Sequence, residues 1–307
     1  MAINQGSGSL TSPGLILASN KAIMEAQRGI AFAKYFSTDF SAELQGVGKT
    51  VSVPVFSGSA TVFNESDNDF ETTDGSIIPV NVTLDTLVKV TFSLGVADLL
   101  EVDKTSTSRN CGVAAGRAIG RKLEEIICGL LTYGARKAAA TSFTVAKLGK
   151  AIATAQDNDL DPSTLVAILR PSFYGDLLDA NTNNAAIQGD DIAGALGRKY
   201  GIKAILCSSM ASAYSAADAQ KGAGFLVPDS AIAIAGRGIE QPVNGMYAEY
   251  GTQTDENSGL AVTSFVHGAP GKIRRYMNVA ALLGAKLTRV TSPSDNKAPG
   301  YIQLVTA

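Results

Sequence analysis

The chain has 307 residues, a formal net charge of −2, 45% hydrophobic residues and only 18% charged residues. Its length accommodates one large domain or two ordinary ones. The charge balance gives no basic footprint for phosphate binding, so direct nucleic-acid recognition is not expected, although a protein can enclose DNA without binding it. The low content of charge is typical of a subunit that covers much of its surface with copies of itself.

The cysteines and the N-terminus bear on the compartment of the protein. Cys111, Cys128 and Cys207 have no CxxC spacing, so we expect reduced thiols that pack as small hydrophobic residues. The N-terminus lacks the charged flank and apolar stretch of a signal peptide, and nowhere do roughly 20 apolar residues follow one another. We therefore expect the chain to stay in the cytoplasm where it is made, without a membrane partner.

The first quarter of the chain predicts an arm, a helix and two short strands. Residues 1–19 are small, polar and glycine-rich, which favours an extended arm. From Asn20 a helix is predicted, because apolar residues recur along one stripe up to Ala33. Valine alternates at residues 51, 53 and 55, which predicts a strand, and a second strand is predicted at 60–63.

A long alternation of apolar residues follows from Ile78 to Leu94. Apolar residues at every second position are typical of a strand with one buried face, and Thr86 replaces one of them without shifting the alternation. As one strand it would reach roughly 55 Å at about 3.3 Å per residue. A globule of this chain length is itself only about 50 Å across. The ribbon therefore either bends sharply or projects from the body, and a projecting ribbon needs a neighbour to cover its apolar face.

The next predicted element is a long helix from Ser108 to Tyr133. Glycines at 112, 116 and 120 recur at four-residue spacing and line one side of it, so another backbone can approach closely. The second half of the chain alternates between short helices and strands, as in an α+β or α/β domain. Helices are predicted at 145–156 and 172–180, and strands at 164–169, 202–207, 231–235 and within 260–305.

No catalytic, cofactor-binding or metal site is predicted. Gly48-Lys49-Thr50 resembles the end of a phosphate-binding loop, but Glu43 occupies the position of its first glycine. The stretch 231–238 resembles the start of a dinucleotide-binding fingerprint, but Pro242 prevents the helix that would bind pyrophosphate.

Two further polar groups are also expected to be structural. His267 is the only histidine and has no GxSxG motif to accompany it, so we expect a partly buried strand residue. Asp157, Asp159 and Asp161 resemble calcium ligands, but Pro162 stands where an EF-hand needs glycine. An acidic turn at the end of a helix is the better interpretation.

Charge is concentrated in an acidic segment between residues 64 and 76, which contains no basic residue. It is either a solvated loop tip or an electrostatic contact with the basic face of the long helix on a neighbouring subunit. A second candidate for assembly is the polar loop 181–191. The candidate inter-subunit contact residues of the electrostatic hypothesis are Glu65, Asp67, Asp69, Glu71, Arg109, Arg117, Arg121 and Lys122.

In this order the elements resemble the major capsid proteins of tailed bacteriophages with the Hong Kong 97 fold. The resemblance covers nearly the whole chain and lies in the joint order of patterns that are individually weak. The stretches that carry it are GKTVSVPVFSGSATVF, VTLDTLVKVTFSLGVADLLE, SRNCGVAAGRAIGRKLEEIICGLL, DPSTLVAILRPSFYGDLLDA, RKYGIKAILCSSMA and FLVPDSAIAIAGR.

The resemblance implies an α+β fold with five segments. They are an N-terminal arm (1–44), an extended loop with peripheral-domain strands (45–106), the spine helix of the peripheral domain (107–140), an axial domain (141–260) and returning strands of the peripheral domain (261–307). Some members of this family crosslink a lysine to an asparagine, but no such pair can be matched here.

The implied function is that of a major head protein without enzymatic activity or cofactor. It would assemble as pentamers and hexamers into an icosahedral shell around double-stranded DNA, with scaffolding, portal and possible decoration proteins as partners. Its location would be the virion, after assembly in the host cytoplasm. The alternatives are an encapsulin-like bacterial nanocompartment, which has the same fold and a protein cargo, and an unrelated cytoplasmic α/β enzyme.

Overall fold

The structure is a computed structural model with fifteen described stretches of chain. They contain three sheets and several helices, and all structural statements below concern them. The described residues are 20–22, 24–25, 33–36, 50–57, 76–95, 104–131, 136–139, 145–157, 160–179, 192–209, 222–239, 249–255, 260–268, 274–288 and 301–305.

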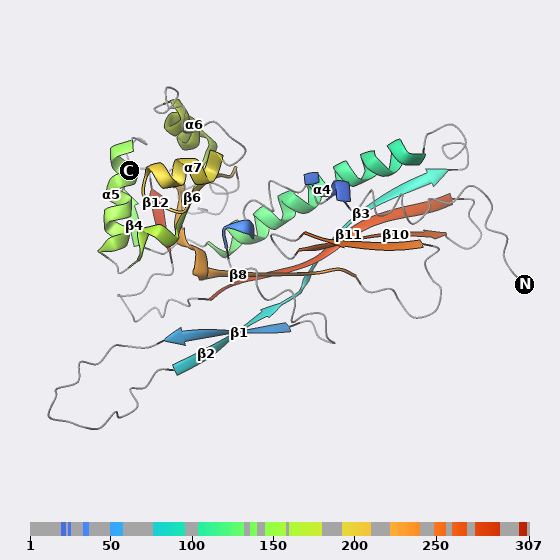
Figure 1. Cartoon of the computed structure of the whole chain (residues 1–307), viewed down its shortest axis with the longest axis horizontal. Helices are drawn as coiled ribbons and strands as arrows, with labels where there is room; N and C mark the ends of the chain where they lie inside the picture. Colours follow the sequence, from blue (N-terminus) through green and yellow to red (C-terminus); the bar gives the residue numbers. More distant parts are fainter. Residues whose placement is uncertain are drawn as a thin grey trace, which may run out of the picture.

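The sheets form an elongated molecule with a body at one end, a long helix and sheet beside it, and a ribbon below (Figure 1). Strands β1 (Thr50–Ser57) and β2 (Ser76–Thr83) form the two-stranded antiparallel ribbon. The long sheet has the order β3-β11-β10-β9, and β8 also pairs with β11. Its strands are β3 (Thr86–Gly95), β8 (Ile232–Arg237), β9 (Glu249–Thr254), β10 (Ala261–Gly268) and β11 (Arg274–Leu287).

The predicted long strand from Ile78 to Leu94 is wrong as a single element. It is divided between β2 and β3 at Leu84 and Asp85, because its pairing partner changes there from β1 to β11. The predicted phase is confirmed, since Val80, Val82 and Leu84 are buried and the residues between them are exposed. The same side of the strand continues along β3, where its residues Val88, Val90 and Phe92 are half-buried.

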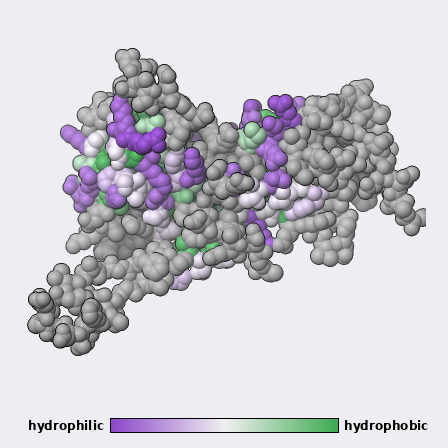
Figure 2. Space-filling view, in the orientation of Figure 1, coloured by the Kyte–Doolittle hydropathy of each residue, from purple (hydrophilic) through white to green (hydrophobic). Residues whose placement is uncertain are grey.

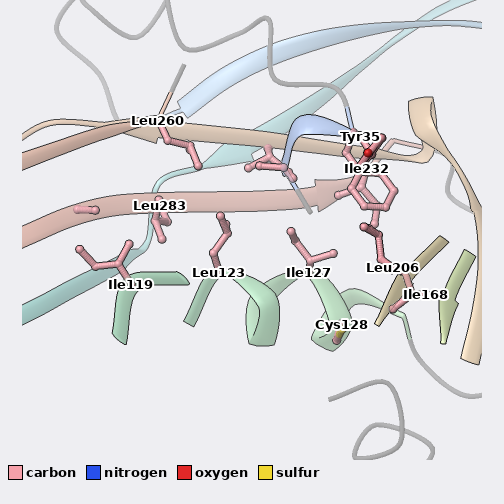
Figure 3. Close-up of a cluster of buried hydrophobic side chains, with 14 of the residues drawn as sticks. Tyr35, Ile119, Leu123, Ile127, Cys128, Ile168, Leu206, Ile232, Leu260 and Leu283 are labelled. Atoms are coloured by element: carbon pink, nitrogen blue, oxygen red, sulfur yellow. The ribbon is translucent and has the colours of Figure 1, made fainter. Parts of the chain in front are cut away.

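The predicted long helix is confirmed as α4 (Lys104–Leu130), which lies along the long sheet (Figure 1). Its apolar stripe packs on the face of β11 that carries Val279 and Leu283. The amphipathic spacing of i, i+4 and i+8 places this stripe on one side of the helix. In Figure 3, Ile119, Leu123 and Ile127 point from α4 towards the strand that carries Leu283.

The body contains a central sheet with the order β4-β12-β7-β5-β6. Its strands are β4 (Arg136–Ala139), β5 (Leu165–Leu169), β6 (Ala204–Cys207), β7 (Gly222–Pro228) and β12 (Ile302–Val305). Every residue of β5 is buried, as in a strand covered on both faces. One face packs on α5 (Val145–Gln156), α6 (Pro171–Asp179) and α7 (Ile192–Lys199).

The other face of the central sheet joins the core beneath α4. Val166 and Ile168 of β5 belong to the same buried cluster as Ile127 of α4 and Val279 of β11. Tyr35, from the N-terminal part of the chain, lies in this junction beside Ile232 and near Leu206 (Figure 3). The two larger sheets therefore share one continuous core.

The segments inferred from the resemblance do not coincide with single sheets. Segment 261–307 is divided, because β10 and β11 lie in the long sheet whereas β12 pairs with β4 and β7 in the central sheet. Segment 141–260 likewise contributes β8 and β9 to the long sheet. Pairing follows the burial of apolar faces between distant segments, so order along the chain does not reveal it.

Candidate functional site: the exposed and buried faces of α4

Helix α4 presents a polar surface opposite its buried stripe. The exposed residues on this face are Arg109, Asn110, Ala114, Arg117, Ala118 and Arg121. Figure 2 shows hydrophilic side chains gathered at the upper centre of the molecule, where Figure 1 places α4. We call these six residues the arginine face. It holds three of the sequence-predicted contact residues, and Lys122 lies at its margin.

Two of the predicted contact residues already have ion-pair partners within the chain. Arg117 Nε lies 3.3 Å from Glu25 Oε2, and the arginine side chain remains 72% exposed. Lys122 Nζ lies 3.0 Å from Glu125 Oε1, one helical turn away. Among the described residues, Arg109 and Arg121 have no ion-pair partner within 4.0 Å.

Glu124, which lies between Lys122 and Glu125 in the sequence, is buried, unlike these two residues. Glu124 is only 2% exposed and faces the end of β6, where the hydroxyl of Ser208 donates a hydrogen bond to its Oε1 atom. Ser208 Oγ also lies 3.6 Å from the Sγ atom of Cys128. This buried cluster joins α4 to the central sheet. It also removes one carboxylate of α4 from the surface, so the exposed helix is more basic than its composition indicates.

The N-terminal part of the chain crosses α4 at Gly116. A Cβ atom at this position would lie 2.2 Å from the backbone oxygen of Ala22, so only glycine permits the crossing. The close approach predicted from the glycine spacing is therefore confirmed at Gly116, and the approaching backbone belongs to the same chain. The adjacent pair of Glu25 and Arg117 lies at the same crossing.

The same N-terminal part is also tied to the central sheet. Lys203 Nζ, just before β6, lies 2.7 Å from Asp229 Oδ2 and donates to the Tyr35 carbonyl at 3.4 Å. Tyr35 and Phe36 are buried in the core shared by α4 and both larger sheets. Ala33, Tyr35 and Phe36 are thus buried in a part of the chain that the family resemblance assigns to the N-terminal arm.

The ribbon is attached through a small apolar cluster at its base. Val51, Val53, Val82 and Leu84 pack there on alanines of β8. A Cβ atom on Gly284 of β11 would lie 2.3 Å from the Thr83 carbonyl oxygen, so glycine lets the ribbon strand cross the β11 backbone at this point. The break between β2 and β3 lies directly after this crossing.

His267 lies in β10, as a partly buried strand residue, which confirms the sequence expectation. Asn278 links two neighbouring strands, since its Nδ2 atom lies 2.9 Å from His267 Nδ1 and its Oδ1 atom accepts from Thr91 at 2.6 Å. The His267 ring stacks on Tyr276 with centroids 5.4 Å apart. These contacts join β10 and β3 to β11, which lies between them.

Asp161 also has a structural role. It accepts hydrogen bonds from the backbone nitrogen and the hydroxyl of Ser163 at 2.9 and 2.8 Å, and these bonds lower the pKa of its carboxyl. It thereby caps the short helix η2 (Pro162–Thr164). Within the described residues, no group of three metal-binding side chains occurs and no helix is long and apolar enough to cross a membrane.

The acidic half of the predicted electrostatic contact, Glu65, Asp67, Asp69 and Glu71, lies outside the described residues. The polar loop 181–191 lies there too, so both assembly hypotheses stay predictions. No pattern in the sequence predicts that Glu25, Lys203 and Gly284 contribute to the arrangement. Their partners lie tens to hundreds of residues away, and no local pattern marks them.

Comparison with known proteins gives likeness in structure only. No protein-family model matches the sequence, and no curated protein matches it. The virus-like particle from Pyrococcus furiosus is 13% identical, with a TM-score of 0.52, and the match covers 94% of this chain and 97% of that one. The capsid of Ralstonia phage GP4 is 14% identical, with a TM-score of 0.50, covering 85% and 84%.

The chain has the Hong Kong 97-type capsid fold. This agrees with the fold class expected from the sequence.

Proposed function

We propose that this chain is the major capsid protein of a tailed bacteriophage, which self-assembles into the icosahedral shell around a double-stranded DNA genome. The observation that carries the proposal is the fold, which matches shell subunits over 85–94% of this chain and 84–97% of theirs. A match confined to one half would leave room for an added domain with another activity.

The geometry supports the same conclusion. Among the described residues, the ribbon packs on β8 around its base, through Val51, Val53, Val82 and Leu84. A two-stranded ribbon is marginally stable by itself, so its outer part needs a neighbour. The low charge content fits a subunit that covers much of its surface with copies of itself.

The proposed role is structural and not enzymatic. Glu124, His267 and Asp161 each have hydrogen-bond partners that account for them structurally. We further propose homo-oligomeric pentamers and hexamers, with scaffolding, portal and decoration proteins as partners. The expected location is the virion, after assembly in the host cytoplasm.

Electron microscopy of the purified chain tests the proposal, with and without a scaffolding protein from the same source. We expect closed shells or ring-shaped oligomers of uniform size, and light scattering should report particles of megadalton mass. A stable monomer or small oligomer under all these conditions would contradict the proposal and favour the cytoplasmic enzyme.

The contents of the shells separate the phage head from the encapsulin-like compartment, which shares the fold. Particles isolated from the natural source should contain nuclease-protected double-stranded DNA. A single enriched protein cargo in place of DNA would favour the compartment. This measurement does not depend on whether the purified chain assembles by itself.

A further inference from the structure

The charge of the chain is unevenly distributed. Helix α4 contains five basic residues and two glutamates, a net charge of +3, whereas the whole chain carries −2. The rest of the chain therefore carries −5. One glutamate of α4 is buried against Ser208 and the other is paired with Lys122. The exposed helix is thus a basic strip on an acidic protein, which the net charge conceals.

The arginine face lies on a long helix that is packed on the core. Arg109 and Arg121 are separated by twelve residues, which is about 18 Å along a helix axis at 1.5 Å per residue. Arg117 lies between them on the same exposed side. The core holds the backbone of the helix from beneath, and the three arginines extend from its exposed side, with Arg121 about 120° around the helix axis from Arg109 at 3.6 residues per turn. The guanidinium group of arginine forms bidentate hydrogen bonds with phosphate oxygens.

The composition of this face favours a polyanion over another protein. Between the arginines lie only Asn110, Ala114 and Ala118, without a large apolar or aromatic side chain. Protein interfaces place such anchors at their centres and leave charges at the rim. A nucleic-acid backbone needs no apolar anchor, because the release of counterions from its phosphates supplies the binding free energy.

We propose that the arginine face contacts the phosphate backbone of the enclosed double-stranded DNA, without regard to base sequence. The inference rests on the proposed function, because it requires that α4 faces the interior of the shell. The ion pair between Arg117 and Glu25 is exposed and therefore weak, so the guanidinium can exchange the carboxylate for a phosphate. The small side chains of Ala114 and Ala118 let the duplex approach the helix closely.

Fluorescence anisotropy of a labelled 30-base-pair duplex of random sequence, titrated with unassembled full-length chain, tests the proposal. The variant carries Arg109→Gln, Arg117→Gln and Arg121→Gln. The matched control removes the same charge from exposed cations elsewhere, through Lys89→Gln, Lys150→Gln and Arg198→Gln. Circular dichroism establishes that all three proteins are folded.

We expect the arginine-face variant to lose at least about tenfold in affinity at low salt, while the control binds as the unmodified chain does. The slope of log K against log salt should fall by about 3, since each phosphate contact contributes about 0.9. Equal DNA binding by the variant and the control would overturn the proposal.

Assembly without DNA provides the second readout. We expect both triple variants to form shells of unchanged size, because the proposed contact is with DNA. If only the arginine-face variant fails to assemble, the occupant of this face is the acidic segment of a neighbouring subunit and the proposal is wrong. Shells that form normally but do not bind DNA through this face would refute the inference and leave the proposed function standing.

Discussion

Two helical glycines should respond in opposite ways to the same substitution. Gly116→Ala places a methyl group against the Ala22 backbone, so we expect a loss of about 1–3 kcal/mol in the free energy of unfolding. Gly149→Ala, in the exposed part of α5, meets nothing within 4 Å and should stabilise by about 0.4–1 kcal/mol. Denaturant unfolding of the two variants measures both.

Gly149→Ala serves as the control for Gly116→Ala, because the gain in helix propensity from glycine to alanine is the same at both positions. If Gly116→Ala were as stable as Gly149→Ala, the crossing of the N-terminal segment over α4 would be wrong. Sequence alone predicts that a glycine row permits close approach. It does not reveal which backbone approaches, since Ala22 is distant in sequence and lies on a different element.

The thiol of Cys128 should make the stability of the protein depend on alkaline pH. Burial raises the pKa of Cys128 from 9.0 to about 12, with the Glu124 charge adding to the effect. The folded protein therefore holds this proton more tightly than the unfolded chain. The contribution is complete below pH 9 and is lost as the pH rises from 9 towards 12.

Cys128→Ala isolates this effect from the titration of lysines and tyrosines. We expect the variant to be less stable than the unmodified chain at pH 8, by roughly 0.5–3 kcal/mol, and the difference to narrow by pH 10.5. Denaturant unfolding at the two pH values measures it. A difference that stays constant would mean that the thiol is not protected from ionisation.

At the scale of elements, the base of the ribbon should depend on one leucine. Leu84 is 2% exposed within the small cluster that holds the ribbon, whereas Leu87, three residues later, is 55% exposed. We expect Leu84→Ala to cost about 2–5 kcal/mol and Leu87→Ala to cost almost nothing. Hydrogen exchange should then accelerate in β1 and β2 for the first variant only.

Faster exchange throughout the protein, or equal effects of the two substitutions, would show that the ribbon is not held separately at this point. The comparison is stringent because both residues are leucines on neighbouring parts of one continuous alternation. They differ in which side of the strand they occupy, and therefore in burial.

The sequence predicts elements well where one local pattern is long. Helix α4 and the phase of β2 and β3 follow from periodicity, and α5, α6 and β5 were also expected close to their observed bounds. Helix α7 was missed because it is short, β7 because glycine and proline interrupt its apolar residues, and β9 because it has no apolar alternation. The division at Leu84 depends on Gly284, which no local signal indicates.

At the scale of the whole molecule, the polar loop 181–191 remains a candidate for assembly. If it lies near a symmetry axis of the shell, replacing Asn183, Asn184 and Gln188 together by alanine should alter the ratio of capsomers to closed shells, or the shell size. Sedimentation and electron microscopy measure these. Unchanged capsomers and shells would remove the loop from the list of contacts, because loops tolerate change unless they touch a partner.

The fold class was predictable because several weak patterns occur in one order, whereas the arrangement of the sheets was not. The last strand, β12, joins the central sheet by pairing with β4 and β7, and Lys203 ties the N-terminal segment to the same region. Contacts of this kind depend on which apolar faces of sheets and helices are buried against one another. The local patterns of a single sequence do not indicate which distant faces pack together.

The passage from β2 to β3 restricts how the length of this chain can change. Two residues, Leu84 and Asp85, separate the strands. Even-numbered residues therefore face the same side of the strand before and after the crossing at Gly284. An insertion or deletion of one residue here would turn every side chain on one flank to the opposite face. Related chains should therefore differ in length at this point by even numbers of residues, or compensate with a bulge nearby.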